Sequence, residues 1–238
     1  MTTLEGGIIV LVGAGEFLET MLPVDRYLVE QMLAREVTPR VAIVPTASAP
    51  DGGEVPQKWA KMGIEHFGRL GLAAQAVMLL TRQDADDPGI VAQLAEANFV
   101  YFSGGKPRYL METLQGSAAW QAILEMFRQG GTIAGCSAGA MVLGEALFDF
   151  PQFWRTIPAL GLVPGIVVIP HFDEIPSMLT RTITSGSHKE TVVGVDGGTA
   201  LVISNGRWIV QGKGGVTVFN QKQKLRYSAG EEIALKAM

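Results

Sequence analysis

Cysteine, charge and long apolar runs are all scarce in this sequence. Cys136 is the only cysteine, so no disulfide can form within the chain. Charged residues make up 18% of the chain and the net charge is -4, which leaves no basic surface for nucleic acid. No apolar stretch approaches the roughly eighteen residues of a membrane helix, and the first residues lack the basic region of a secretory signal. We therefore expect a cytoplasmic protein with no nucleic-acid or membrane partner.

Apolar residues are abundant instead. With 238 residues, 47% of them apolar, the chain can bury a large core, and we assign residues 1–238 to a single α/β domain. Predicted strands alternate with predicted helices. The strands are expected at 7–12, 41–44, 74–80 and 99–102, and the helices at 20–36, 55–70, 87–97, 107–114 and 117–129. This rhythm indicates a doubly wound, mostly parallel sheet flanked by helices.

The pattern changes in the last third of the chain. The stretch 148–158 is aromatic and without clear periodicity, a strand is expected to end at His171, and residues 177–184 fit a helix. Short strands with Gly-rich turns are then expected at 191–195, 200–204, 207–211 and 216–219, and Asn205-Gly206 is typical of a type I′ hairpin. We interpret residues from about 190 to 238 as an antiparallel β extension of the same domain.

The segment Gly135-Cys136-Ser137-Ala138-Gly139 matches the G-x-S-x-G nucleophile elbow. An apolar strand precedes it and a helix-compatible stretch follows it, which is the context that the motif needs. The two outer glycines fit a turn in which a side chain at either flank would clash. Ser137 would then expose its hydroxyl at the N-terminus of a helix, where unpaired N–H groups favour a developing oxyanion.

Two other features of the sequence suggest a functional role that we do not adopt, namely Cys136 as a nucleophile and the segment 13–16 as a dinucleotide-binding loop. If Cys136 were the nucleophile, the glycine frame would be lost, so we interpret it as a small buried residue behind the turn. Gly13-Ala14-Gly15-Glu16 lacks the third glycine of a dinucleotide fingerprint, because position 18 is Leu18. We therefore expect no cofactor there and interpret the segment as a strand-end loop near the crevice.

A serine nucleophile needs a base, and the chain offers three histidines. His66 lies in a predicted helix and is expected to be partly exposed without a catalytic role, whereas His188 lies in a predicted solvent loop. His171 follows a strand end directly after a proline. By elimination, His171 is the predicted base.

The carboxylate that would orient the histidine is less well defined by the sequence. Four acidic residues lie near Ser137 or His171 along the chain: Glu145, Asp149, Asp173 and Glu174. Asp149 stands between the serine and the histidine in a segment long enough to fold back, which favours it. No histidine–carboxylate spacing recurs, so no metal site is predicted.

Four segments together carry a resemblance to a known family. They are Phe102-Ser103-Gly104-Gly105, the stretch 131–140 around Ser137, the stretch 160–165 leading to His171-Phe172, and the stretch 193–201. In this order they resemble the cyanophycinase and dipeptidase E family of serine peptidases, over nearly the whole chain.

The resemblance implies a fold similar to the class I glutamine amidotransferases, a flavodoxin-like arrangement, with serine in place of cysteine. It implies Ser137 as nucleophile and His171 as base. It also implies an oxyanion hole formed by the backbone N–H of Ala138 and that of Gly104 or Gly105. Asp149-Phe150-Pro151 looks like the family's acid-aromatic-proline segment, which implies Asp149 as the acid.

The sequence departs from this family where substrate would be held. Cyanophycinases carry arginines just after the His-Phe pair, and this chain has Asp173 and Glu174 there. A substrate carboxylate would instead need Lys106, Arg108 or Arg155 from other loops. The acidic pair favours a substrate with a free amino group or a basic side chain, unless both residues are solvated and begin the next helix.

We therefore expect a serine hydrolase that cleaves an amide bond in a small peptide, without a cofactor. Two alternatives stay open: a catalytically silent binding or regulatory module of the same fold, and a glutaminase subunit of an amidotransferase. The intact pair of Ser137 and His171 weighs against the first, and the serine-centred elbow weighs against the second. Whether the chain forms a homodimer is left open.

Overall fold

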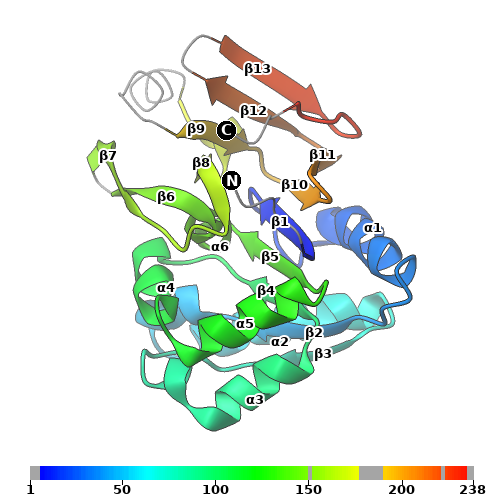
Figure 1. Ribbon diagram of the computed structural model, residues 1–238, viewed down its shortest axis with the longest axis vertical. Coiled ribbons are helices and arrows are strands. Elements are labelled where there is room, and N and C mark those ends of the chain that lie inside the picture. Colours follow the sequence, from blue (N-terminus) through cyan, green and yellow to red (C-terminus); the bar gives the residue numbers. More distant parts are fainter. Residues whose placement is uncertain (1–5, 150–151, 177–189, 221–222, 235–238) are drawn as a thin grey trace.

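The computed structural model describes residues 6–149, 152–176, 190–220 and 223–234. Two β-sheets organise them (Figure 1). The first sheet has seven strands in the order β11-β10-β1-β5-β4-β2-β3, and the second has six in the order β13-β12-β9-β8-β6-β7. In Figure 1 the second sheet occupies the upper part of the molecule, and helices α2, α3 and α5 lie in the lower part.

Five parallel strands form the centre of the first sheet. They are β1 (Ile8–Val12), β5 (Thr132–Cys136), β4 (Phe99–Phe102), β2 (Arg40–Val44) and β3 (Ala73–Ala76). Two antiparallel strands, β10 (Thr199–Ser204) and β11 (Arg207–Gly212), extend the sheet beside β1. The predicted mostly parallel sheet is confirmed, and β5, which carries the elbow, lies near its middle.

Helices cover both faces of this sheet, so its central strands β1, β4 and β5 are buried along their whole length. The helices are α1 (Leu22–Leu33), α2 (Val55–Arg69), α3 (Pro88–Glu96), α4 (Pro107–Leu114), α5 (Ala118–Arg128) and α6 (Ala138–Leu143). Along β1, Ile8 and Val10 pack with residues of α1 and α2, whereas Ile9 and Leu11 join the cluster that contains α3 to α6. Short 3-10 helices lie at Glu19–Met21, Thr46–Asp51, Asp84–Asp86 and, as η4, at Phe172–Glu174.

The second sheet is mixed. Its strands are β6 (Gly144–Asp149), β7 (Gln152–Pro158), β8 (Val163–Ile169), β9 (Thr191–Val195), β12 (Gly215–Asn220) and β13 (Gln223–Ser228). β8 runs parallel to both β6 and β9, and the other pairs are antiparallel. One face of this sheet, including Leu147 and Val168, packs into the same core as α6.

The structure refines several sequence-based boundaries. The aperiodic stretch 148–158 belongs to the β6–β7 hairpin, where a register shift between Phe148 and Asp149 breaks the alternation of a regular strand. The predicted C-terminal strands are present but divide between the two sheets, so they do not form a separate layer. The helix predicted at 177–184 lies outside the described residues. Within the described ranges, none of the helices has the length and apolarity that a membrane crossing demands.

Candidate active site

Ser137 lies at the carboxyl end of β5, in a sharp turn. Its backbone conformation occurs in neither a regular strand nor a regular helix. Its backbone angles, φ 50° and ψ -110°, are in a sparsely populated region for a residue with a side chain. A Cβ on Gly135 would lie 2.3 Å from the carbonyl carbon of Gly139, and a Cβ on Gly139 would lie 2.6 Å from the Phe102 oxygen. The two glycines are therefore required by close backbone packing, as the motif predicts.

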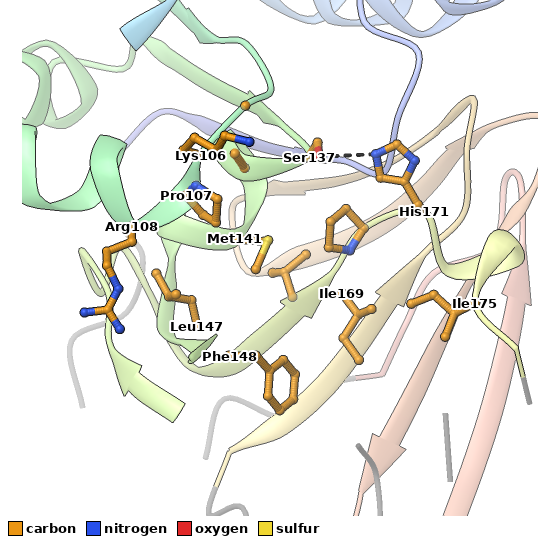
Figure 2. Close-up of a pocket in the computed structure, with 14 residues that line it drawn as sticks. Lys106, Pro107, Arg108, Ser137, Met141, Leu147, Phe148, Ile169, His171 and Ile175 are labelled. Atoms are coloured by element: carbon orange, nitrogen blue, oxygen red, sulfur yellow. Dashed lines mark hydrogen bonds between the residues drawn. The ribbon is translucent and has the colours of Figure 1, made fainter. Parts of the chain in front are cut away.

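His171 reaches Ser137 from the other sheet. It follows β8 in a left-handed conformation, with φ 51° and ψ 36°, and its N–H donates to the Gly13 carbonyl at 3.3 Å. Its Nε2 lies 3.2 Å from the Ser137 Oγ, as the dashed line in Figure 2 marks. The His171 side chain is 42% exposed, so the pair is open to solvent. The structure thus brings together the predicted nucleophile and the predicted base.

The carboxylate on the far side of His171 belongs to Glu174. Its Oε2 lies 3.4 Å from the His171 Nδ1. The Asp149 carboxylate instead pairs with the Arg108 and Arg155 side chains, and no contact between Asp149 and His171 is found among the described residues. The role of Asp149 as the triad acid therefore stays a prediction. Its contacts with Arg108 and Arg155 do not support that role.

Glu145, the remaining acidic candidate of the elbow region, accepts a hydrogen bond from the Gly165 N–H through its own carboxylate. This contact joins β6 to β8 and leaves the Glu145 carboxylate on a backbone amide instead of on His171. Asp173 similarly accepts the Gly197 N–H at 2.7 Å. Both acidic side chains are thus used to hold the backbone around the site.

Glu16 is a buried acidic residue beside the elbow that the sequence interpretation passes over. It follows β1 in the glycine loop and is 5% exposed. Its Oε1 accepts the Gly104 N–H at 2.7 Å, and its Oε2 accepts the Cys136 thiol at 2.8 Å. Its position at the carboxyl end of a central strand was the signal that could have pointed to it.

The Glu16 contact distinguishes the two glycine amides that are predicted for an oxyanion hole. The Gly104 N–H is already bonded to a carboxylate. Within the described part of the chain, the N–H groups of Gly105 and Ala138 have no hydrogen-bond partner. These two amides are therefore the ones available to a ligand beside Ser137.

Cys136 is fully buried, and its thiol donates to the Glu16 carboxylate. Burial raises the pKa of the Cys136 thiol well above its usual value, and the Glu16 carboxylate adds to the shift. A protonated, inaccessible thiol is a poor nucleophile. The interpretation of Cys136 as a small buried residue agrees with this geometry.

The basic residues proposed for substrate binding are all paired in the structure. The Lys106 Nζ lies 3.7 Å from the Asp51 carboxylate. Arg108 pairs with Asp149 and with Glu112, and Arg155 lies 3.8 Å from Asp149. Lys106 and Arg108 still line the cavity beside Ser137, whereas Arg155 and Asp173 do not.

The structure corrects the expected exposure of His66. Instead of being partly exposed on its helix, His66 is fully buried, with its Nε2 2.8 Å from the Asp25 carboxylate of α1. The helix turns this side chain inward, toward Phe17 and Phe67. His188 lies outside the described residues. Within the described ranges, no three His, Cys, Asp or Glu side chains gather as metal ligands would.

A cavity of about 540 Å³ opens beside Ser137 and His171. It lies between α6 and strands β6 and β8, with the first turn of α4 at one side. Figure 2 shows side chains from these elements, among them Met141, Leu147 and Ile169, gathered next to the Ser137–His171 pair. This volume falls within the range of small-molecule sites, and the cavity contains the reactive serine at its edge.

Comparisons with known proteins relate the chain to peptidases. The sequence profile described as peptidase family S51 matches residues 9–211. The chain is 26% identical over 168 residues to the uncharacterized peptidase YgaJ of Bacillus subtilis (strain 168), covering 70% of this chain and 68% of that protein. It is 26% identical over 133 residues to the uncharacterized peptidase PM1590 of Pasteurella multocida (strain Pm70), covering 52% and 64%.

Solved structures give the same relationship. The crystal structure of a peptidase from an acI-B1 Actinobacterium superposes with a TM-score of 0.88 at 32% identity, covering 97% of each chain. A Listeria monocytogenes EGD-e protein described as a candidate peptidase E protein shares the fold, with a TM-score of 0.63 at 18% identity, covering 87% of this chain and 98% of that one. The resemblance found in the motifs is confirmed: the chain belongs to peptidase family S51, a family of serine peptidases.

Proposed function

We propose that this peptidase hydrolyses an amide bond in a small peptide through Ser137 and His171. The single observation that carries the proposal is the 3.2 Å separation between the Ser137 Oγ and the His171 Nε2, at an elbow whose glycines cannot be replaced without a clash. A hydroxyl at hydrogen-bond distance from an imidazole is the arrangement that general-base activation requires.

In the first half of the reaction, the Ser137 Oγ attacks the peptide carbonyl while its proton passes to the His171 Nε2. The oxyanion that forms accepts hydrogen bonds from the Gly105 and Ala138 amides. As the intermediate collapses, the C–N bond breaks and His171 returns the proton to the leaving amine. The product is an acyl-enzyme ester on Ser137 and a free amine.

In the second half, water attacks the ester carbonyl and gives its proton to His171. The C–O bond to Ser137 breaks, the serine recovers the proton, and the acid product leaves. His171 is neutral in the resting state in this scheme, with its Nδ1–H donating to a carboxylate. The contact at 3.4 Å favours Glu174 for that role over Asp149.

The test is a peptide hydrolysis assay on the purified chain and on a Ser137→Ala variant, with release of free amine as the readout. Small peptides should be cleaved, and Ser137→Ala should lower kcat by about four to six orders of magnitude, as loss of a triad nucleophile does. A folded wild-type chain that cleaves no peptide would favour the silent binding module. Equal rates in both proteins would remove Ser137 from the mechanism.

A further inference from the structure

The cavity beside Ser137 has a strongly apolar wall. Six of the side chains that line it are Met141 of α6, Leu147 and Phe148 of β6, Val168 and Ile169 of β8, and Ile175 just after η4. They come from four places along the chain, and the second sheet supplies four of the six. Met141, Leu147 and Val168 belong to the core around α6, whereas Phe148, Ile169 and Ile175 belong to the cluster on the other face of the second sheet; Figure 2 labels all of them except Val168.

The two basic side chains at the cavity each have an acidic partner, although Lys106 extends toward Ser137 in Figure 2. Lys106 pairs with Asp51, and Arg108 pairs with Asp149. In Figure 2 the Arg108 guanidinium points away from Ser137 and His171. A substrate carboxylate placed among the apolar side chains would therefore lose its hydration without gaining an unpaired cation, which is unfavourable.

The two acidic residues after His171, Asp173 and Glu174, do not create a preference for a positively charged substrate group either. Asp173 holds the Gly197 amide and Glu174 contacts His171. Neither carboxylate lines the cavity, so an ammonium or guanidinium group within it would also lack a partner. The group of a substrate that occupies the cavity is therefore expected to be apolar.

The position of the cavity indicates that it receives the residue on the acyl side of the cleaved bond. Ser137, Gly105 and Ala138 all border it, and these residues would hold the attacked carbonyl and its oxyanion. The side chain of the residue that contributes this carbonyl starts two bonds from the carbonyl carbon, on the Cα bonded to it. That side chain is therefore the part of a substrate directed into the cavity.

We propose that this peptidase selects a large apolar residue, such as Leu, Met or Phe, on the acyl side of the bond that it cleaves. This inference rests on the proposed function of Ser137 and His171. Burial of such a side chain should raise kcat/KM about 10- to 100-fold over alanine at the same position. Aspartate and lysine at that position should be cleaved more slowly than alanine.

The test compares two dipeptide panels, X-Ala and Ala-X, in which X is Leu, Met, Phe, Ala, Asp or Lys. The proposal expects the strong apolar preference in the X-Ala panel. Equal or faster cleavage of Asp-Ala or Lys-Ala, or an apolar preference confined to Ala-X, would overturn it. Cleavage that still depends on Ser137 would then leave the proposed function standing, whereas no cleavage and no labelling of Ser137 by a fluorophosphonate would overturn both.

Two substitutions place the preference in the cavity itself. Ile175→Arg should lower the Leu-Ala to Asp-Ala ratio of kcat/KM at least tenfold, because the new cation pairs with the aspartate side chain. Leu147→Asn, a polar change of similar volume on another element, should lower the Leu-Ala to Ala-Ala ratio. Ile175→Leu and the distant Leu33→Arg, at a 52% exposed position, are the matched controls and should keep the wild-type ratios. Unchanged ratios in both cavity variants, with thermal melts confirming that they fold, would overturn the proposal.

Discussion

Two histidine–carboxylate pairs occur among the described residues, and they differ in burial. His66 and Asp25 lie 2.8 Å apart with side-chain exposures of 0% and 1%. His171 and Glu174 lie 3.4 Å apart with exposures of 42% and 67%. The buried pair has the shorter contact, yet in the described part of the chain no serine is hydrogen-bonded to His66. The exposed pair has Ser137 at 3.2 Å and borders a cavity.

The difference shows that a short, buried histidine–carboxylate contact does not identify a reaction centre. Asp25 and His66 lie on α1 and α2, on the face of the first sheet packed with aromatic side chains. One further atom of each residue, Asp25 Oδ1 and His66 Nδ1, is buried without a hydrogen-bond partner. We therefore expect this pair to affect stability and not catalysis, whereas His171 has the access that a substrate needs.

Replacing each histidine by alanine should separate these roles most strongly. His171→Ala should lower kcat by about three orders of magnitude or more, because the base is lost while the fold stays. His66→Ala should leave the catalytic groups in place but lower the free energy of unfolding by about 3–5 kcal/mol, because it leaves Asp25 buried without its partner.

The measurements are peptide hydrolysis per folded molecule and chemical denaturation, made on both variants. His66→Gln is the control for volume, and it should recover part of the lost stability. A folded His66→Ala variant with activity as low as that of His171→Ala would break the comparison.

The carboxylate beside the exposed histidine should have a smaller effect. Glu174→Gln should lower kcat by about tenfold or more, because the Nδ1–H of His171 loses a charged acceptor; the high exposure of Glu174 keeps the loss below that of a buried triad acid. Asp149→Asn should change kcat less, since its partners are Arg108 and Arg155. The opposite ranking in steady-state kinetics would return the acid role to Asp149.

The buried pair should have its own signature in the pH dependence of stability. Burial raises the pKa of Asp25, and the contact with His66 only partly opposes this. Between the unfolded pKa of about 3.9 and the higher folded one, the folded state binds more protons, so the free energy of unfolding falls as pH rises.

Asp25→Asn should remove this contribution, which amounts to at most about 1.4 kcal/mol per pH unit. Denaturation curves collected at several pH values above 4, for wild type and variant, give the comparison. Glu174→Gln serves as the control and should keep the wild-type slope. Identical slopes for wild type and Asp25→Asn would show that Asp25 titrates as in the unfolded chain.

Features that depend on residues close together along the chain could be predicted from the sequence. The elbow at Ser137 was predictable because its glycines lie two positions away on either side, and their close backbone contacts are required by that one turn. The central strands β1, β2, β4 and β5 were predictable because each is a short apolar run ending in a turn signal. His171 was found because a strand end leads into it.

Contacts between distant segments were not predictable in the same way. Glu16 meets Gly104 and Cys136 across 88 and 120 positions, so no local pattern shows that its carboxylate occupies an amide beside the serine. His66 was misjudged because Asp25, 41 positions away, turns it inward. Asp149 pairs with Arg108 of α4 and Arg155 of β7. The order of these residues along the chain does not determine whether they meet in space.

The most direct test of the account is the site at which a fluorophosphonate reacts. The probe should label the wild-type chain on Ser137, as peptide mass mapping would show, and should not label Ser137→Ala. His171→Ala should be labelled far more slowly. Iodoacetamide should leave the buried Cys136 unmodified and the activity intact. Labelling at another residue, or inactivation by iodoacetamide of a chain that resists the fluorophosphonate, would contradict the assignment of Ser137 as the nucleophile.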